Sequence, residues 1–306
     1  MSFFGSNKKR RSFQKFLVIV PFMFLVFMFA YFPLYGWVFT FFDYKPPIPL
    51  SKSPFVGLHW FSYLFGNKIK ILQLWQVLKN TFAISGLNVL FSWLPMAFAI
   101  FLHEIRLVRY KKIIQTVTTL PNFISWVLVF SIAFSLFSSS GMINNLLLGL
   151  GVIEQPIRYL ETSKGIYLSM WMWYTWKSLG WAAIMYIAAI AGIDETLYEA
   201  ARVDGAKRFQ IIRHITVPGL LPTYFVLLLL QIASFLNNGM EQYFVFQNAF
   251  NKETIQVLDL YVYNLATGGG SYSLSAGISM LKSVISVGLL TFVNALSKSI
   301  RGDSIV

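Results

Sequence analysis

The residues best placed to do chemistry lie in a polar stretch, residues 199–218, inside an otherwise strongly apolar sequence. Ala200 and Ala201 follow an acidic residue; alanine favours helix and leaves room for another surface to approach the backbone. Asp204 precedes Gly205, which permits the backbone angles that end a helix. The stretch therefore predicts two short helices joined by a turn, with a surface that another protein can approach.

The sequence offers little support for a catalytic site or a metal site. The histidines, at positions 59, 103 and 214, are far apart, and the acidic residues near position 199 are balanced by four basic ones. A Ca²⁺ or Mg²⁺ site needs acids that converge without such neutralisation. Cysteine is absent, and so is a G-x-x-x-x-G-K-[ST] phosphate loop. We therefore predict no catalytic residue, no metal site and no cofactor on this chain.

The elements that must position the polar stretch are membrane helices. Of the 306 residues, 56% are hydrophobic and only 12% are charged, which excludes an ordinary soluble domain. We predict an all-α, polytopic membrane protein whose spans each need about 20 apolar residues. The six predicted spans are residues 16–42, 80–102, 113–137, 166–192, 219–237 and 276–297. A cleavable signal peptide over residues 1–40 is disfavoured, because its apolar run is too long and no cleavage site follows.

Basic residues indicate the orientation of these spans. They gather before the first span, between the second and third, in the loop 193–218 and after the last span. Because short cytoplasmic connections are enriched in Lys and Arg, we expect both termini and this loop in the cytoplasm. The predicted organisation is a basic tail (1–15), a transmembrane domain (16–300) and a C-terminal tail (301–306). Anionic lipid accounts for the net charge of +13 without a nucleic acid partner.

The polar stretch resembles the cytoplasmic Glu-Ala-Ala loop of ABC importer permeases, in its sugar-importer form. Glu199, Gly205, Ile215 and Pro218 stand at the family's spacing, while Val217 replaces a usual leucine and keeps an apolar side chain. Softer matches to the branch for oligosaccharides and polysaccharide fragments extend the resemblance over roughly residues 15–300. They are residues 31–36, 42–44, 57–61, 259–263, 275–277, 281–284 and 294.

This resemblance implies a type I importer permease with several partners. They are a second homologous permease, two ATPase subunits that hold ATP and Mg, an extracellular sugar-binding protein, an oligosaccharide and membrane lipid. The ATPase-coupling residues implied by the resemblance are Glu199, Ala200, Ala201, Arg202, Asp204, Gly205, Arg208 and Pro218. Arg202 could instead pair with Glu199 along one helix, since the two are three residues apart.

A sugar path would need aromatic faces and planar polar groups. The candidates are Trp173, Tyr174, Lys177, Asn237, Asn238, Glu241, Tyr243 and Lys282. Aromatic side chains near an interface are also ordinary membrane anchors, and a lysine within a span can be structural. If Lys177 and Lys282 both line the path, an acidic sugar is favoured.

Other readings of the sequence remain open. A peptide or amino-acid ABC importer shares the Glu-Ala-Ala loop and is disfavoured only by the softer matches. An ion-driven secondary transporter would need an ion or proton site in the membrane, yet the six predicted spans contain no acidic residue. A membrane enzyme, such as a lipid-modifying transferase, lacks a plausible acid and base.

Overall fold

Helices account for the regular structure of the protein in a computed structural model that describes residues 3–301. The exception within this range is an isolated bridge between Phe42 and Phe55. The prediction of an all-α membrane protein is therefore confirmed. Most of the predicted C-terminal tail, residues 302–306, lies outside the described residues, as do residues 1 and 2.

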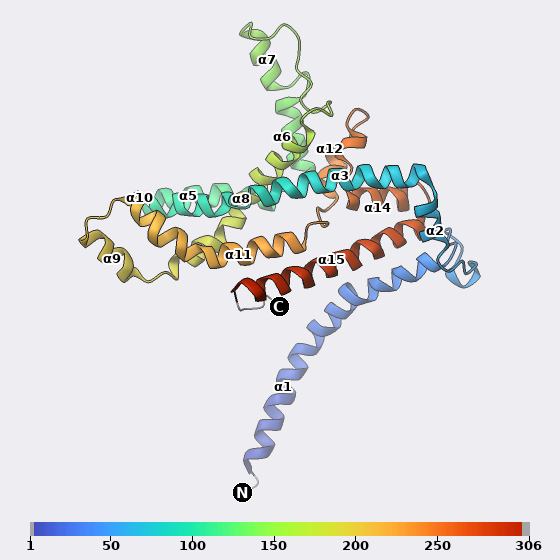
Figure 1. Ribbon diagram of the computed structural model, residues 1–306, viewed down its shortest axis with the longest axis horizontal. Coiled ribbons are helices and arrows are strands. Elements are labelled where there is room, and N and C mark those ends of the chain that lie inside the picture. The colour runs from blue at the N-terminus through green and yellow to red at the C-terminus, as the bar shows by residue number, and fades with distance from the viewer. Residues whose placement is uncertain (1–2, 302–306) are drawn as a thin grey trace. The chain divides into compact units, whose positions relative to one another are not determined.

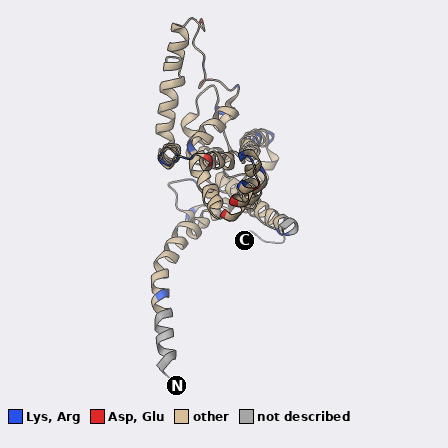
Figure 2. Ribbon diagram, turned by 90° about the vertical axis from the view of Figure 1, so that its left-hand side faces the viewer, with Lys and Arg blue, Asp and Glu red and all other residues tan. Residues whose placement is uncertain are grey.

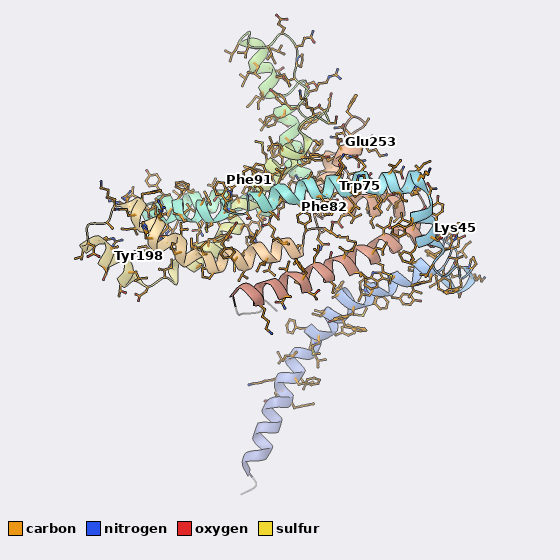
Figure 3. All side chains as sticks on the ribbon, viewed as in Figure 1. Lys45, Trp75, Phe82, Phe91, Tyr198 and Glu253 are labelled. Carbon is orange, nitrogen blue, oxygen red and sulfur yellow. The ribbon has the colours of Figure 1, made fainter. Side chains whose placement is uncertain are left out.

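The described residues contain five helices that are long and apolar enough to cross a membrane. They are Phe13–Phe41, Lys68–Glu104, Trp126–Gly149, Arg208–Ala233 and Tyr272–Ala295. A sixth is reached if Ile166–Ala191 and Glu195–Val203, bent by 70° at a short break, are taken as one span. Their outward side chains are largely apolar, as on Trp75 and Phe82 (Figure 3), which suits helices surrounded by lipid tails.

The chain forms two compact units, the first of which comprises residues 1–67 and 264–281. Its elements are α1 (Phe3–Val26), η1 (Phe27–Tyr31), η2 (Phe32–Phe41), η3 (Leu50–Lys52), α2 (His59–Gly66) and the adjoining parts of α14 (Leu258–Thr267) and α15 (Tyr272–Arg301). Ser273 joins the two segments: its hydroxyl donates to the carbonyl of Phe42 at 2.7 Å and accepts from the N–H of Tyr44 at 3.1 Å.

The second unit comprises residues 68–263 and the chain from 282 onward. Its helices before α14 are α3 (Lys68–Leu90), α4 (Leu94–Glu104), α5 (Val108–Thr119), η4 (Leu120–Phe123), α6 (Trp126–Phe137), α7 (Met142–Gly149), α8 (Ile166–Ala191), α9 (Glu195–Val203), α10 (Arg208–Ile211), η5 (Ile212–Thr216), α11 (Val217–Ala233), α12 (Glu241–Phe246) and α13 (Lys252–Ile255). Helix α8 is central, because α3, α4, α5, η4 and α11 all pack against it (Figure 1).

Helix α5 approaches α8 closely enough to require a glycine. A Cβ atom placed on Gly180 of α8 would lie 2.2 Å from the carbonyl oxygen of Thr118. A second buried group, including Ala99, Tyr186 and Leu220, joins α4, α8 and α11. Through these contacts, α8 packs against α4, α5 and α11.

The third predicted span, residues 113–137, is wrong as a continuous helix. The chain forms α5, breaks through η4 and residues 124–125, and resumes as α6, which leads away from α5 in Figure 1. Pro121 lacks a backbone N–H and restricts the residue before it, so the helix is weakened at this point. The membrane-crossing stretch that begins at Trp126 continues instead through α7 to Gly149.

The connections predicted to lie outside the membrane contain helices of their own. Residues 138–165 contain α7, and residues 238–275 contain α12, α13 and the whole of α14. The side chain of Asn144, fully buried, donates to the carbonyls of Ser138 and Ile157 and accepts from the N–H of Ile157, all at 2.8–2.9 Å. Asn80, also fully buried, donates to the carbonyls of Glu253 and Gln256. Hydrogen bonds from buried side-chain amides thus fix the irregular parts of these segments to their neighbours.

Candidate functional site

The polar stretch, residues 199–218, begins within α9, a helix whose N-terminus is capped. The carboxylate of Asp194 accepts a hydrogen bond from the N–H of Thr196 at 3.0 Å. This bond holds the pKa of Asp194 below its ordinary value, because it stabilises the charged form. Glu195 lies in the first turn and Arg202 in the last, and both charges suit the helix dipole.

Gly205 ends α9 in a left-handed conformation, with φ of +74°. Its N–H donates to the carbonyl of Arg202 at 3.1 Å, and the N–H of Ala206 donates to the carbonyl of Ala201 at 2.9 Å. These two bonds form a Schellman motif, which satisfies the last helical carbonyls and turns the chain sharply. The predicted turn at Asp204 and Gly205 is therefore present.

The second short helix continues directly into the membrane. The N–H of Lys207 donates to the side-chain oxygen of Gln210 at 2.7 Å, at the start of α10. From Arg208 to Ala233 the chain is one apolar helix of 26 residues, which includes the π-helical turn η5. Pro218 follows the π-helical turn η5 by two residues and does not end the helix.

Two contacts attach this α9–α10 segment (residues 194–211) to its neighbours. The hydroxyls of Tyr198 and Thr216 lie 3.2 Å apart and join α9 to η5. The Nε atom of Arg208 lies 4.0 Å from a carboxylate oxygen of Glu104, at the end of α4. The segment is thus held at both of its helices, although none of the residues of α9 is buried.

The outward surface of the α9–α10 segment mixes charge with apolar groups. Glu199, Arg202 and Asp204 are exposed, and Figure 2, which faces this end of the second unit, shows acidic and basic residues close together. Val203 is 88% exposed and Phe209 is 72% exposed. Charged groups around uncovered apolar side chains are typical of a surface that docks against another protein. The coupling roles of these residues stay predictions.

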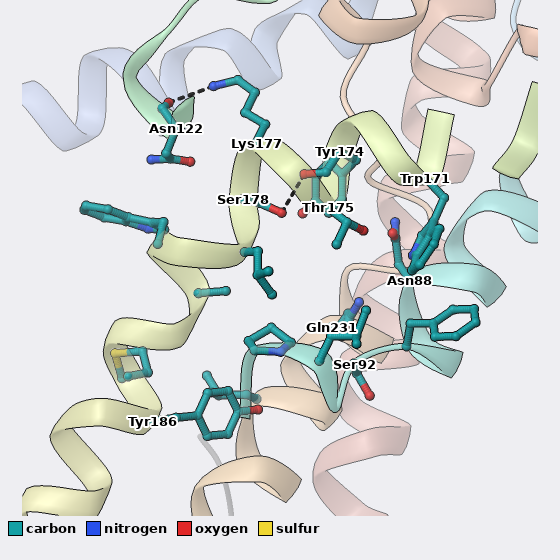
Figure 4. A pocket seen from close by; sticks show the side chains of 18 of the residues that line it. Asn88, Ser92, Asn122, Trp171, Tyr174, Thr175, Lys177, Ser178, Tyr186 and Gln231 are labelled. Carbon is teal, nitrogen blue, oxygen red and sulfur yellow. Dashed lines mark hydrogen bonds between the residues drawn. The ribbon is translucent and has the colours of Figure 1, made fainter. Parts of the chain in front are cut away.

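A cavity of about 480 Å³ opens beside α8 (Figure 4). Its aromatic walls include Trp171 and Tyr174, and its polar groups come from different helices. They are Asn88, Ser92, Asn122, Thr175, Lys177, Ser178 and Gln231. The volume lies within the range of small-molecule sites, and the mixture of aromatic faces and amides suits a ligand rich in hydroxyl groups.

Lys177 closes one side of this cavity at the break between α5 and α6. Its ammonium donates to the carbonyl of Asn122 at 2.7 Å and to that of Pro121 at 3.2 Å. It also lies 5.5 Å from the centre of the Trp126 ring, which adds a cation–π attraction. The lysine thus adds donors to the carbonyls at the helix break, where the regular pattern of helical hydrogen bonds ends.

Apart from Tyr174 and Lys177, the predicted path residues do not line this cavity. Trp173 packs against Phe137, Trp176 and Phe246, and it borders a separate, more apolar pocket of about 800 Å³. Asn237 and Glu241 are exposed, whereas the side-chain oxygen of Asn238 accepts from Ser85 at 2.9 Å.

The two remaining candidates are engaged within the protein. Tyr243 is only 2% exposed, and burial raises the pKa of its hydroxyl. Lys282 donates to the carboxylate of Asp259, which also accepts from the N–H of Gly239 at 2.9 Å.

Sequence reasoning missed Asn88 and Gln231, which line the cavity from α3 and α11. Each is a side-chain amide inside a strongly apolar helix. Such a group is costly in lipid and therefore signals an interior or ligand-facing position. That signal was available in the sequence, but it does not say which helices bring the amides together.

Comparison with known proteins places the chain in a transport family. Residues 106–302 match the family described as "Binding-protein-dependent transport system inner membrane component". Protein LplB of Bacillus subtilis is 35% identical, over 92% of this chain and 88% of the relative. The polygalacturonan/rhamnogalacturonan transport system permease protein YteP of the same organism is 34% identical, over 95% and 89%.

A solved structure shares the fold at similar identity. A chain of a bacterial ABC transporter involved in the import of the acidic polysaccharide alginate superposes with a TM-score of 0.84 at 30% identity, and the match covers 96% of this chain and 98% of that one. The family match spans the α9–α10 segment, α8 and α11, which carry the exposed surface and most of the cavity. The chain belongs to the family of binding-protein-dependent transport system inner membrane components.

Proposed function

We propose that this chain is the membrane-spanning permease subunit of an ATP-driven importer for oligosaccharides. An extracellular binding protein delivers the sugar, and a separate ATPase supplies the energy through residues Glu199–Pro218. The observation that carries the proposal is the exposed α9–α10 segment, which is joined without a break to a helix that lines the cavity.

The substrate class is supported by the relatives. YteP is named for polygalacturonan and rhamnogalacturonan transport. In a second alginate transporter structure, 29% identical to this chain, the transporter is in complex with an "alginate pentasaccharide-bound periplasmic protein". The aromatic faces of Trp171 and Tyr174 can stack on sugar rings, and the amides of Asn88 and Gln231 can bond to hydroxyl groups.

The coupling mechanism follows from the connection between the α9–α10 segment and α11. ATP binding draws two ATPase subunits together, and their motion displaces the docked α9–α10 segment. Because Arg208–Ala233 is one helix, the displacement is transmitted to Gln231 at the cavity wall. This is switching by movement of rigid helices, which opens the path alternately to the two sides.

The importer needs partners beyond this chain. They are a second, homologous permease, two ATPase subunits carrying ATP and Mg, and the extracellular sugar-binding protein. The distribution of Lys and Arg supports cytoplasmic termini and a cytoplasmic α9–α10 segment in a bacterial cell membrane. The ATPase can reach the segment only in this orientation.

Charge reversal at Glu199 tests the docking role, since this side chain is exposed. Purified with its partner subunits, Glu199→Lys is expected to lose ATPase subunits, or to keep them without hydrolysis stimulated by the binding protein. Glu154→Lys makes the same change in a connection predicted to lie outside the cell, and it should retain the ATPase. Unchanged retention and stimulation in Glu199→Lys would contradict the proposal.

A further inference from the structure

We propose that the cavity beside α8 selects oligosaccharides that carry carboxylate groups, with Lys177 as the residue that binds the carboxylate. This inference rests on the proposed function and narrows its substrate to acidic sugars such as uronic acid oligomers. It depends on the position of Lys177, on its hydrogen-bond partners and on the charges around it.

The ammonium of Lys177 retains a donor for a ligand. A lysine ammonium has three N–H groups. Two are accounted for by the carbonyls of Pro121 and Asn122, both neutral acceptors. Lys177 also lines the cavity together with Tyr174 and Ser178 (Figure 4). The third N–H is bonded to neither carbonyl, and the ammonium lies 5.5 Å from the ring of Trp126, which also lines the cavity, so we infer that a ligand there can reach it.

The positive charge of Lys177 lacks a contacting acid. The cavity-lining residues include no Asp or Glu, and the ion pairs in the described part of the chain do not involve this lysine. The acid whose charge reaches Lys177 is Glu241, which makes no ion pair with it. A carboxylate on the ligand would supply the counter-charge that no acidic side chain lining the cavity provides.

Lys282 provides the contrast within the same chain. Its ammonium contacts the carboxylate of Asp259, and both side chains are largely buried. That positive charge is neutralised inside the protein, and Lys282 does not line the cavity. Of the two lysines that could have favoured an acidic sugar, the structure leaves Lys177 alone in this role.

Two substitutions, one uncharged and one charged, separate the charge of Lys177 from its structural bonds. Lys177→Gln keeps N–H donors for the carbonyls of the α5–α6 break but removes the charge, whereas Lys177→Arg keeps both. The permease complex with its ATPase, in lipid nanodiscs and without binding protein, is titrated with trigalacturonic acid and with its fully methyl-esterified form. Binding is followed by tryptophan fluorescence, because Trp126, Trp171 and Trp181 line the cavity.

We expect the wild-type complex to bind the acid more tightly than the ester. Lys177→Gln should weaken binding of the acid by about tenfold or more, the size of a lost charge-assisted hydrogen bond, and leave the ester nearly unchanged. Lys177→Arg should preserve the preference. The double variant Lys282→Met/Asp259→Asn removes a lysine charge away from the cavity, and it should keep the wild-type ratio of the two affinities.

Equal binding of acid and ester by the wild type, or equal weakening of both by Lys177→Gln, would overturn the charge preference. ATP hydrolysis stimulated by the binding protein, measured on the same complexes, tests the proposed function separately. If hydrolysis is stimulated while the two probes bind alike, importer function stands and only the acidic-sugar assignment fails.

Discussion

Gly205 shows how one residue can define the α9–α10 segment. Its φ of +74° disfavours side chains, yet a Cβ atom there would meet nothing within 4 Å. The requirement for glycine is therefore conformational and does not arise from crowding inside this chain. Any crowding must come from a docked partner, so substitutions can tell the two demands apart.

We predict that Gly205→Ala destabilises the turn by about 1 kcal/mol, the usual cost of a left-handed residue with a Cβ atom. Gly205→Asn should cost less, since asparagine tolerates this conformation. Hydrogen exchange at the N–H of Ala206, which donates to Ala201, measures both. If Asn restores protection but not ATPase coupling, the partner needs the space; equal effects of Ala and Asn on exchange would contradict the conformational argument.

At the scale of elements, helix α8 organises the second unit by offering different faces to different neighbours. One face receives α5 at Gly180, and another lines the cavity with Tyr174 and Ser178. Since both faces belong to one helix, a change in the α5 contact should also move the cavity wall. This coupling between packing and site can be tested at the glycine.

Gly180→Ala is expected to destabilise the unit by about 1–3 kcal/mol, because its Cβ would collide with the backbone of Thr118 and force the helices apart. Gly86→Ala, in α3, is the matched control: its Cβ meets nothing within 4 Å. That control should be neutral or slightly stabilising, as alanine favours helix over glycine. Thermal unfolding of the purified complexes compares the two, and a lower melting temperature for Gly86→Ala than for Gly180→Ala would contradict the packing argument.

At the scale of the whole molecule, the sequence was sufficient for the class of protein and for most spans. Long apolar runs and the distribution of basic residues are global signals that do not depend on tertiary contacts. The break in the third span was not predictable in this way. Proline also occurs inside α1 and α11, at Pro21 and Pro222, without ending either helix. At Pro121 the helix breaks, and Lys177, which lies 56 residues further along, donates to the carbonyls of Pro121 and Asn122.

The candidate site likewise has one part that the sequence predicts and one part that it does not. The turn at Gly205 could be predicted because its signal is local, in adjacent residues. The cavity could not, because α3, α8 and α11 each supply only part of its wall, and no pattern within one helix reveals the others. The ion pair of Lys282 could not be predicted, because its partner Asp259 lies outside the predicted spans.

The natural absence of cysteine makes the membrane orientation directly testable. In intact cells, Glu154→Cys is expected to react with a membrane-impermeant maleimide, whereas Lys112→Cys should react only after the cytoplasmic face is opened. Both positions are exposed within the chain. Ala200→Cys should behave like Lys112→Cys but be protected when the ATPase is bound. Labelling of Lys112→Cys from outside would reverse the proposed topology.

The uninterrupted helix from Arg208 to Ala233 also has a mechanical consequence. Arg208 and Gln231 are separated by about 35 Å of helix axis at 1.5 Å per residue. Tyr198 contacts this helix at Thr216, about a third of the way along, where the π-helical turn η5 ends. In the proposed importer, this helix would act as a lever with a short arm toward the ATPase and a longer arm toward the cavity, so that a small tilt at the first end would become a larger displacement at the second.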